Sequence, residues 1–320
     1  MRIIDMHCDT ISRLMESSLE LRENPFHMDL HKMKEAGYLL QNFALFVNMS
    51  KVESPLETGL LMADCFYREM EKNKDLIRPV TTYEEIMKNK EEGLMSALLT
   101  LEEGEICKGN PAILRDFYRL GVRMITLTWN HKNSIGCSNS QAVQPYGTSN
   151  PEGLTENGLA FIEEMERLGV IIDVSHLSDG GFYDVYEHTT RPFVASHSNA
   201  RTVCPHCRNL TDDMIRKMGE RGCVTGLNYY GAFVNPGGYE AKSTVEGIAR
   251  HARHIADLGG IQCVGLGSDF DGFAGECDMK DCSQMNLLED ALKKQGFTSS
   301  DVDKIFYENV LSLYKEILSK

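Results

Sequence analysis

Eight short apolar runs, many of them rich in β-branched residues, recur along the chain and alternate with segments that have helical spacing. One such segment is 154–168, where Leu159, Ile162 and Met165 fall on one stripe of a helix. A strand followed by a helix, repeated eight times, predicts an α/β protein with a (β/α)8 TIM barrel. The runs span residues 2–6, 39–48, 95–101, 124–129, 170–175, 193–196, 223–229 and 263–267. Glycines that would end the preceding helices in a left-handed conformation stand at Gly121, Gly169, Gly222 and Gly259.

An open, doubly wound parallel sheet is the structural alternative, because the number of strands does not prove that the sheet closes. Neither GxGxxG nor GxxxxGK[ST] follows the first run, so the usual phosphate-binding signals of nucleotide enzymes are absent. The length of 320 residues fits either one barrel or two smaller domains. We expect a single barrel domain over residues 1–320, because a division near the middle would separate the polar residues of the predicted site.

The charge of the chain bears on its partners. It has 33 Lys plus Arg against 47 Asp plus Glu, a formal net charge of −14. Binding to nucleic acid rests on clustered basic side chains, so we expect no nucleic-acid partner. No stretch approaches the roughly 18 apolar residues of a membrane-spanning helix, and the N-terminal residues do not resemble a secretory signal. We therefore expect a cytoplasmic protein without a membrane partner.

Ten cysteines are scattered along the chain, several of them inside apolar runs. We expect most of them to be reduced, buried thiols. Only Cys204 and Cys207 have the spacing of metal ligands. A structural zinc site would normally need a second CxxC pair, so we do not predict zinc there.

Ionisable side chains stand at the ends of five of the runs. Burying such a group costs free energy unless it is paired or bound to a metal. The carboxyl ends of barrel strands meet at one mouth, where barrel enzymes carry their active sites. Imidazoles and carboxylates without thiolates suit a zinc, manganese or iron ion with open positions. The residues are His7, Asp9, Glu102, His176, His197 and Asp269.

Taken singly, each of these signals is weak. An HxD tripeptide such as residues 7–9 occurs by chance, although both of its ends face the same side of a strand. Further acids follow Glu102, and an acidic run is ordinarily a solvated turn. A lone histidine such as His176 more often belongs to the core. The combination, with every residue at a carboxyl end, favours a metal site.

The remaining histidines are interpreted as structural. His27 and His31 have i, i+4 spacing but lie in a polar, Lys-rich segment, and we expect His251 and His254 on the exposed face of a helix. Arg208 differs from them, because it lies in a polar loop on the expected active face. A guanidinium there can bind a carboxylate through two hydrogen bonds.

These residues and their surroundings resemble the membrane dipeptidase (renal dipeptidase) family of metallopeptidases, within the amidohydrolase-type barrels, over essentially the whole chain. The resemblance implies a dipeptide-hydrolysing (β/α)8 barrel of the metal-dependent hydrolase type with two zinc ions, and a homodimer by family analogy. It is carried by DMHCDT (5–10), MDLHKMKEAGYLLQNFALFV (28–47), LLTLEEGE (98–105), GVRMITLTWN (121–130), GVIIDVSHLS (169–178), RPFVASHSNARTVCPHCRNLTDDMI (191–215) and GLGSDFDG (265–272).

By motif position, the resemblance implies a complete set of metal ligands. His7 and Asp9 look like ligands of one zinc ion. His176 and His197 look like ligands of the other, and Glu102 resembles the carboxylate that bridges both. We choose Glu102 over its neighbour because it comes directly after the apolar run, as in the family's motif.

The resemblance also implies residues that act on the substrate. Asp269 is similar to the family's proton-handling aspartate, and Arg208 looks like its substrate-binding arginine. The family's mammalian members have a substrate-contacting histidine where this chain has Trp129. We count Trp129 and Asn130 as substrate-binding residues, with Asn130 or the metal itself in place of that histidine.

The mechanistic hypothesis is that a hydroxide bridging two zinc ions attacks the peptide carbonyl, while Asp269 relays the proton and Arg208 binds the terminal carboxylate. Both L,L and L,D dipeptides are candidate substrates. The alternative is an amidohydrolase-type barrel acting on another bond, such as that of an N-acyl amino acid or a lactone. The carboxylated lysine common in those relatives would require Lys where the third run ends in Glu102. An inactive binding protein would be expected to have lost ligands, and none is missing.

Overall fold

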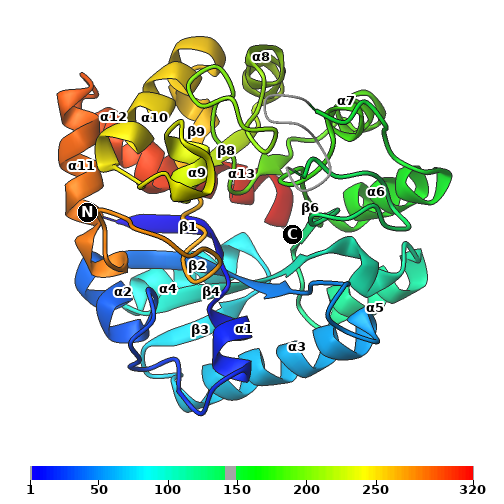
Figure 1. Ribbon diagram of the computed structural model, residues 1–320. Coiled ribbons are helices and arrows are strands. Elements are labelled where there is room, and N and C mark those ends of the chain that lie inside the picture. The colour runs from blue at the N-terminus through cyan, green and yellow to red at the C-terminus, as the bar shows by residue number, and fades with distance from the viewer. Residues whose placement is uncertain (1, 141–148, 320) are drawn as a thin grey trace.

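The computed structural model describes residues 2–140 and 149–319, and in it eight parallel strands form a ring surrounded by helices (Figure 1). The ring strands are β1 (Ile3–Cys8), β2 (Tyr38–Phe46), β4 (Met95–Glu102), β5 (Met124–Thr126), β6 (Ile171–Asp173), β7 (Val194–Ala195), β8 (Val224–Leu227) and β9 (Val264–Leu266). The ring closes because β1 pairs with both β2 and β9, while β2 pairs with β4. The predicted (β/α)8 barrel is confirmed, and the open sheet is excluded. Each of the eight apolar runs overlaps one strand of the ring.

A ninth strand, β3 (Ile77–Val80), was not predicted. It pairs with the first half of β4, and β5 takes over the same edge of β4 from Thr100 onward. The sequence of β3 is IRPV, whose proline has no N–H to donate to a sheet. A four-residue run with a half-buried arginine and an exposed proline carries too weak a signal to be separated from a loop.

Helices cover the outside of the barrel, and short polar side chains begin most of them. Thr155, Ser178 and Thr211, for example, accept hydrogen bonds from backbone N–H groups of the first turns that they cap. The helices are α1 (Thr10–Met15), α2 (Leu30–Ala36), α3 (Pro55–Lys72), α4 (Tyr83–Glu91), α5 (Pro111–Arg119), α6 (Glu156–Leu168), α7 (Asp179–His188), α8 (Asp212–Arg221), α9 (Gly231–Val234), α10 (Val245–Gly259), α11 (Met285–Lys294), α12 (Ser299–Asp303) and α13 (Asn309–Leu318).

The predicted glycine stops hold with one correction. Gly169 and Gly222 end α6 and α8 in the left-handed conformation, each with φ 73°. Gly121, shortly after α5, has φ 101°. Gly259 is still helical, and its neighbour Gly260 adopts the positive φ of 85° after α10. The position of the stop was wrong by one residue because both glycines can take that conformation.

The C-terminal helix α13 covers the N-terminal end of the barrel. Asn309 donates to the carbonyls of Ile261 and Val264, where β9 begins. Tyr314 packs in one buried cluster with apolar residues of several barrel strands, among them Ile4 of β1. Its hydroxyl forms hydrogen bonds with the side chain of Asn42. The opposite, carboxyl end is therefore the open mouth of the barrel.

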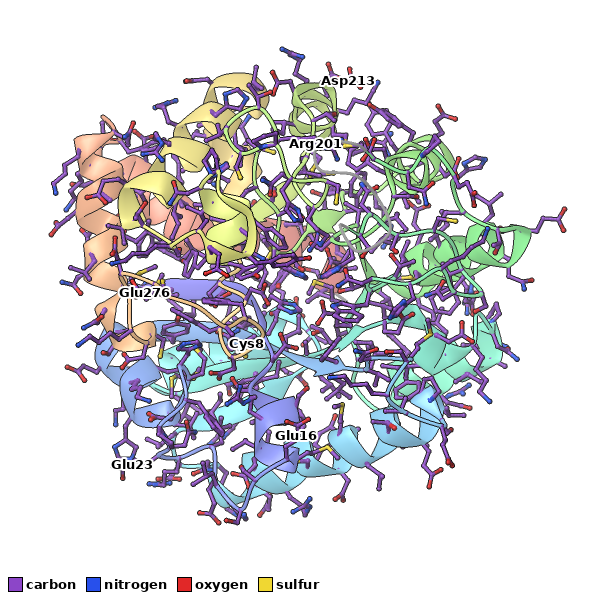
Figure 2. All side chains as sticks on the ribbon, in the orientation of Figure 1. Cys8, Glu16, Glu23, Arg201, Asp213 and Glu276 are labelled. Atoms are coloured by element: carbon purple, nitrogen blue, oxygen red, sulfur yellow. The ribbon has the colours of Figure 1, made fainter. Side chains whose placement is uncertain are left out.

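The loops at that mouth place distant segments on opposite sides. In Figure 1, α1 and α3 lie in the lower half of the view and α8 in the upper half. Figure 2 shows Glu16, directly after α1, and Arg201, in the loop after β7, on these two sides. Residues 130–157, rich in Asn, Ser, Gly and Pro, predict a loop on the active face, and residues 141–148 of that segment lie outside the described residues.

All ten cysteines are free and nine of them are buried, as predicted. Among residues 2–140 and 149–319, no helix is both long and apolar enough to cross a membrane.

Candidate active site

Three imidazoles and three carboxylates meet at the carboxyl mouth of the barrel. His7 lies in β1 and Glu102 is the last residue of β4. The other four follow strands, in the order Asp9 after β1, His176 after β6, His197 after β7 and Asp269 after β9. The structure thus brings together all six residues that the sequence predicted, from five different strands.

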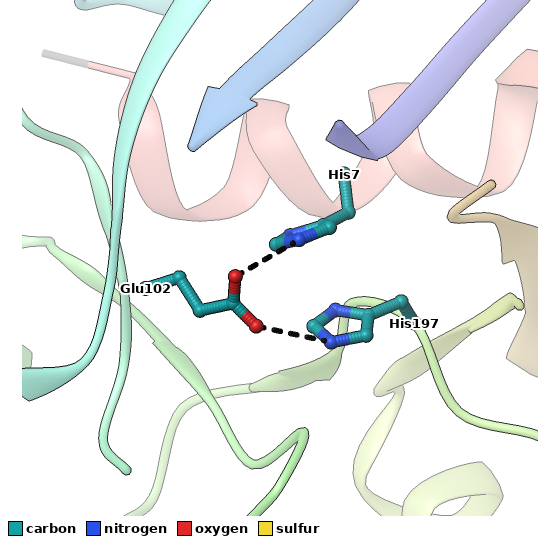
Figure 3. A group of neighbouring side chains, drawn as sticks. All are labelled: His7, Glu102 and His197. Atoms are coloured by element: carbon teal, nitrogen blue, oxygen red, sulfur yellow. Dashed lines mark ion pairs between the residues drawn. The ribbon is translucent and has the colours of Figure 1, made fainter. Parts of the chain in front are cut away.

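Glu102 stands at the centre of this group. Its Oε2 is 3.4 Å from His7 Nε2. Its Oε1 is 3.0 Å from His176 Nε2 and 3.5 Å from His197 Nε2. Figure 3 shows this carboxylate between the rings of His7 and His197. One carboxylate therefore faces imidazoles on both sides, as a bridging ligand would.

Asp9 and Asp269 face the same Nε2 atom of His7 as Glu102 does. His7 Nε2 is 3.5 Å from Asp9 Oδ2 and 4.0 Å from Asp269 Oδ1. A Cβ atom on Gly272 would lie 2.1 Å from Asp9 Oδ2 and 2.5 Å from Asp269 Oδ1, so only glycine fits beneath the two carboxylates. Because two neighbouring carboxylates repel each other, this part of the group favours a bound cation.

Several donor atoms of the group fit a metal ion. Both ring nitrogens of His7 and Oδ1 of Asp9 are buried and form no hydrogen bond with the described residues. The Nε2 atoms of His176 and His197 lie 3.0 Å apart. Buried polar atoms are ordinarily satisfied, and nitrogen and carboxylate ligands suit zinc. Two sets of three ligand atoms could each hold an ion, and both contain His7.

His197 is oriented by two residues that the sequence did not reveal. Its Nδ1 lies 2.7 Å from Ser196 Oγ, which in turn lies 2.6 Å from Asp173 Oδ2. The serine hydroxyl donates to the carboxylate, so it accepts from Nδ1–H of His197. This leaves the lone pair of Nε2 directed at Glu102, as a metal ligand requires.

Asn130 orients His176 in the same way. Asn130 Oδ1 lies 2.9 Å from His176 Nδ1 and accepts its hydrogen bond. Asn130 also lines the cavity above the group. Asn130, which the sequence predicts at the substrate, thus also contacts the candidate metal ligand His176. Sequence reasoning missed this contact.

Backbone strain is concentrated at this site. His176, Asp269 and Asp271 have φ values of 68°, 62° and 70°, and Glu103 has φ 106°. In the described chain only one further residue other than glycine, Lys108, has a positive φ. A left-handed residue costs roughly 1–2 kcal/mol, so the surrounding contacts must hold these positions.

Asp271 ties the Asp269 turn to a distant segment. Its Oδ1 accepts from the backbone N–H of His27 at 2.7 Å, and its own N–H donates to His27 Nδ1 at 3.0 Å. Its Oδ2 accepts from Thr10 Oγ1 at 2.7 Å. His27 is therefore structural, and what it supports is the turn that carries Asp269.

The choice of Glu102 over Glu103 agrees with the geometry. Glu103 is buried and accepts hydrogen bonds from the backbone of Glu105 and Trp129 and from the side chain of Asn133. Burial raises its pKa. The structural alternative of a solvated acidic turn is thus wrong for Glu103, which organises the loops around the site.

Burial sets the protonation of the central groups. It raises the pKa of Glu102 to about 8 and that of Asp269 to about 7. It lowers the pKa of His176 and His197 well below the ordinary value, so both imidazoles are neutral. Burial also opposes protonation of His7, but the charge of Glu102 holds its pKa well above the ordinary value. Carboxylates this costly to ionise are stabilised by a divalent cation.

A cavity of about 260 Å³ opens above the group. Asp9, Glu102, His176 and Asp269 contribute to its lining. Its walls are largely aromatic, formed by Phe46, Trp129, Tyr230, Phe233 and Phe273. Trp129 therefore lies beside the space where a substrate would bind.

Arg208 is buried close to this cavity without itself lining it. Its side chain is 5% exposed and stands over the ring of Phe233, with Cζ 5.4 Å from the ring centre. Its Nη1 lies 3.4 Å from Ser198 Oγ, while Nε and Nη2 have no partner among the described residues. Burial lowers its pKa. Among the described residues, no carboxylate forms an ion pair with this buried guanidinium. It is therefore suited to bind an anionic ligand.

The structure corrects the expectation for His251. This residue is fully buried, accepts from the backbone N–H of Ala200 and lies 2.9 Å from the carbonyl of Val234. His254 is partly exposed and pairs with Asp212. Ile248 and Ile255 flank His251 at helical spacing on α10. This apolar pattern indicates that His251 lies on the buried face of the helix, and sequence reasoning missed it.

Comparison with known proteins identifies the family of this chain. The sequence profile of the family described as membrane dipeptidase (peptidase family M19) matches residues 1–319. An uncharacterized dipeptidase of Schizosaccharomyces pombe is 30% identical over 337 aligned residues, which cover 98% of this chain and 80% of that protein. A solved structure described as a dipeptidase and metallopeptidase of family M19 has a TM-score of 0.91 at 28% identity, covering 100% of this chain and 99% of the other. A metallopeptidase from Rhodobacter sphaeroides, solved with a phosphinate mimic of the dipeptide L-Ala-D-Ala, has a TM-score of 0.91 at 26% identity and covers 99% of both chains. The chain therefore belongs to the membrane dipeptidase family of metallopeptidases, peptidase family M19.

Proposed function

We propose that this dipeptidase hydrolyses the peptide bond of L,L and L,D dipeptides with a hydroxide held between two zinc ions. The observation that supports it is the placement of Glu102, whose two oxygens face His7 on one side and His176 and His197 on the other. Zinc in such a site would polarise the substrate carbonyl and supply hydroxide near neutral pH.

The proposed ligands divide between the two sides of Glu102. His7 and Asp9 would hold one ion and His176 and His197 the other, with Glu102 bridging both. Asp269 is left out of the ligand set because the family resemblance gives it the role of proton carrier, and its Oδ2 accepts from Asn228 Nδ2 at 2.9 Å. Its position in the cavity lining suits contact with substrate and water instead.

Asp269 is the proposed proton carrier. Its carboxylate would accept a proton from the attacking water and pass it to the leaving nitrogen. A pKa of about 7, raised by burial, suits both steps near neutral pH. The bond from Asn228 fixes the orientation of the carboxylate during the transfer.

Arg208 is the proposed clamp for the terminal carboxylate of the substrate. Its unpaired Nε and Nη2 can donate two hydrogen bonds to a carboxylate. A further residue at that end of a longer peptide would collide with the clamp, which favours dipeptides. Trp129 would form a wall beside the substrate, and Asn130 would hold His176 while facing the same cavity.

The test combines metal analysis with a substrate panel. Purified protein is analysed for zinc, manganese and iron, and is assayed on L,L and L,D dipeptides before and after treatment with a chelator. We expect about two zinc ions per chain, hydrolysis of dipeptides, and loss of activity that zinc restores. Absence of any chelator-sensitive dipeptide cleavage would contradict the proposal.

Three broader expectations also remain proposals. They are a single catalytic domain over residues 1–320, a cytoplasmic location and a homodimer. The first is supported by a ring whose strands extend from Ile3 to Leu266 and whose N-terminal end is covered by α13.

A further inference from the structure

A second cavity, of about 410 Å³, adjoins the metal-site cavity. The two cavities share the side chains of Phe46 and Trp129, whose ring centres lie 4.9 Å apart. Residues of α1, of α3 and of the segment between β2 and α3 supply the rest of its lining. The proposed reaction makes no use of this space.

The lining of the second cavity is predominantly apolar. Met15, Val47, Val52 and Met62 line it together with the two shared rings. Methionine side chains are flexible and adapt to apolar ligands of different shape. Met15 is 39% exposed, so a large apolar side chain stands open to solvent at this cavity.

Charge does not determine what this cavity accepts. Glu16 and Lys51 contribute to its lining with opposite signs, and both residues are exposed. Ser12 Oγ is buried and has no partner among the described residues, and Asn48 and Thr58 add an amide and a second hydroxyl to a lining whose larger part is apolar. A neutral, largely apolar group is the chemical class that fits.

The two cavities are complementary in size. The metal-site cavity, with about 260 Å³, is smaller than the roughly 300–1,000 Å³ typical of small-molecule sites. A dipeptide with a large side chain would therefore need the adjoining space. The shared wall of Phe46 and Trp129 places that space directly beside the reacting centre.

The position of Arg208 decides which end of the dipeptide faces this cavity. Arg208 lies in the loop after β7, and Phe46 is the last residue of β2. In the closed ring β2 and β7 are four strands apart in either direction, so they stand opposite each other. Figure 2 shows Glu16, directly after α1, on the side opposite Arg201 of the loop after β7. With its carboxylate at Arg208, a dipeptide would direct its N-terminal residue toward Phe46.

We propose that the second cavity binds the side chain of the substrate's N-terminal residue and selects large apolar side chains, such as those of leucine, methionine and phenylalanine. The inference rests on the proposed dipeptidase function and on the clamp at Arg208. It names a specificity-determining surface made of α1, the segment after β2 and α3.

Two isomeric dipeptides test this inference without any variant. Leu-Gly and Gly-Leu have the same composition, and Gly-Gly is their common reference. We expect kcat/KM for Leu-Gly to exceed that for Gly-Gly by about tenfold or more, because burial of a leucine side chain is favourable. Gly-Leu should gain much less. Equal values for Leu-Gly and Gly-Gly, or a gain confined to Gly-Leu, would overturn the subsite while leaving the dipeptidase function intact.

A matched pair of tryptophan variants locates the effect. Val52→Trp fills the second cavity from a segment that carries none of the proposed metal ligands. Leu61→Trp places the same side chain on α3 at a position that is 56% exposed and outside the lining. We expect Val52→Trp to lower the ratio of Leu-Gly to Gly-Gly turnover toward one and Leu61→Trp to leave it unchanged. An unchanged ratio in folded Val52→Trp would contradict the proposal.

Failure of the underlying function gives a different result. If no dipeptide of the panel is cleaved in a chelator-sensitive way, both the proposed dipeptidase function and the proposed subsite are contradicted. If Gly-Gly is cleaved without preference for Leu-Gly, only the subsite falls. Circular dichroism of each variant shows whether it is folded. If Val52→Trp is not folded, the wild-type comparison of Leu-Gly, Gly-Leu and Gly-Gly decides between the outcomes.

Discussion

At the scale of single residues, the site depends on side chains that hold other side chains. His197 reaches Asp173 through the hydroxyl of Ser196, and His176 is held by Asn130. Each contact leaves the Nε2 lone pair of a histidine directed at Glu102. The ligands are thus oriented by the protein, which reduces the cost of organising them around an ion.

Replacing Asp269 by asparagine tests the proton carrier. Asparagine keeps the size and the bond with Asn228 but cannot accept a proton, so we expect kcat to fall by about 10²- to 10⁴-fold. Metal content, measured by elemental analysis, should remain that of the wild type. Asp290→Asn, at an exposed position of α11, is the matched control. Wild-type turnover in Asp269→Asn with its metal retained would refute the role.

Arg208→Met tests the carboxylate clamp. Methionine fills much of the same space without charge, so the variant should lose the preference for a free terminal carboxylate. We expect the ratio of kcat/KM for Ala-Ala to that for Ala-Ala amide to fall by about 30-fold or more. Arg216→Met on α8, which is exposed, should keep the wild-type ratio. A ratio unchanged by Arg208→Met would exclude the clamp.

At the scale of elements, the turn after β9 is fixed from outside the barrel. Asp271 and His27 each bind the backbone N–H of the other, although 244 positions separate them. His27 also packs against Phe270 and Phe273. This double contact stabilises two left-handed aspartates, and it positions Asp269 through the backbone of the turn.

Two substitutions of His27 separate packing from hydrogen bonding. His27→Phe keeps an aromatic ring but leaves the N–H of Asp271 without its acceptor, and we expect kcat to fall roughly tenfold with little change in KM. His27→Asn offers Oδ1 in place of Nδ1 and should restore most of the loss. The measurement is the steady-state kinetics of both variants at equal metal content. Equal kcat in His27→Phe and the wild type would show that the contact does not position Asp269.

Two buried histidines, His251 on α10 and His206 in the loop after β7, make stability depend on pH. Burial lowers the pKa of His251 to about 4, and that of His206 likewise to about 4. Because the folded pKa lies below the unfolded value of about 6.5, the stabilisation is present above pH 6.5 and is lost as the pH falls toward 4. We expect each histidine to remove about 2 kcal/mol of unfolding free energy between pH 7 and pH 5.

Urea denaturation at both pH values measures this loss. His251→Gln should show a smaller difference between pH 7 and pH 5 than the wild type, because one of the two buried histidines no longer titrates. His188→Gln, at an exposed position at the end of α7, should behave as the wild type. The same pH difference in His251→Gln as in the wild type would rule out its contribution.

At the scale of the whole molecule, the metal site connects strands from both halves of the chain. Its proposed ligands come from β1 and β4 on one side and from the ends of β6 and β7 on the other. Two ions bound there would together link four strands of the ring, so metal binding and folding should be linked. The single domain proposed for residues 1–320 should accordingly unfold as one unit.

Two probes at different places test this cooperativity. Trp129, the one tryptophan of the sequence, lines the metal-site cavity and reports on it by fluorescence, while far-ultraviolet circular dichroism reports on the helices. We expect coincident thermal transitions with zinc bound, and a lower Tm after chelation. Two separate transitions in the zinc-loaded protein would indicate two domains.

The limits of sequence reasoning are visible in particular elements. Repeated apolar runs predicted all eight ring strands, because a strand buried on both faces appears in the sequence as a continuous apolar run. The strand β3 was missed because Pro79 and its short length hide the pattern. His251 was placed on the wrong face, because its charged neighbours in sequence, Arg250 and Arg253, obscured the apolar stripe on which it lies.

The sequence by itself determined the barrel and the residues at its mouth. Strand and helix periodicities are local, and the carboxyl end of each strand is known once the strand is known. Only the tertiary structure decided that Glu102 occupies the centre, that Asp173, Ser196 and Asn130 orient the histidines, and that a second cavity adjoins the first. These features are contacts between side chains from separate strands and loops, and such contacts exist only after the ring has closed.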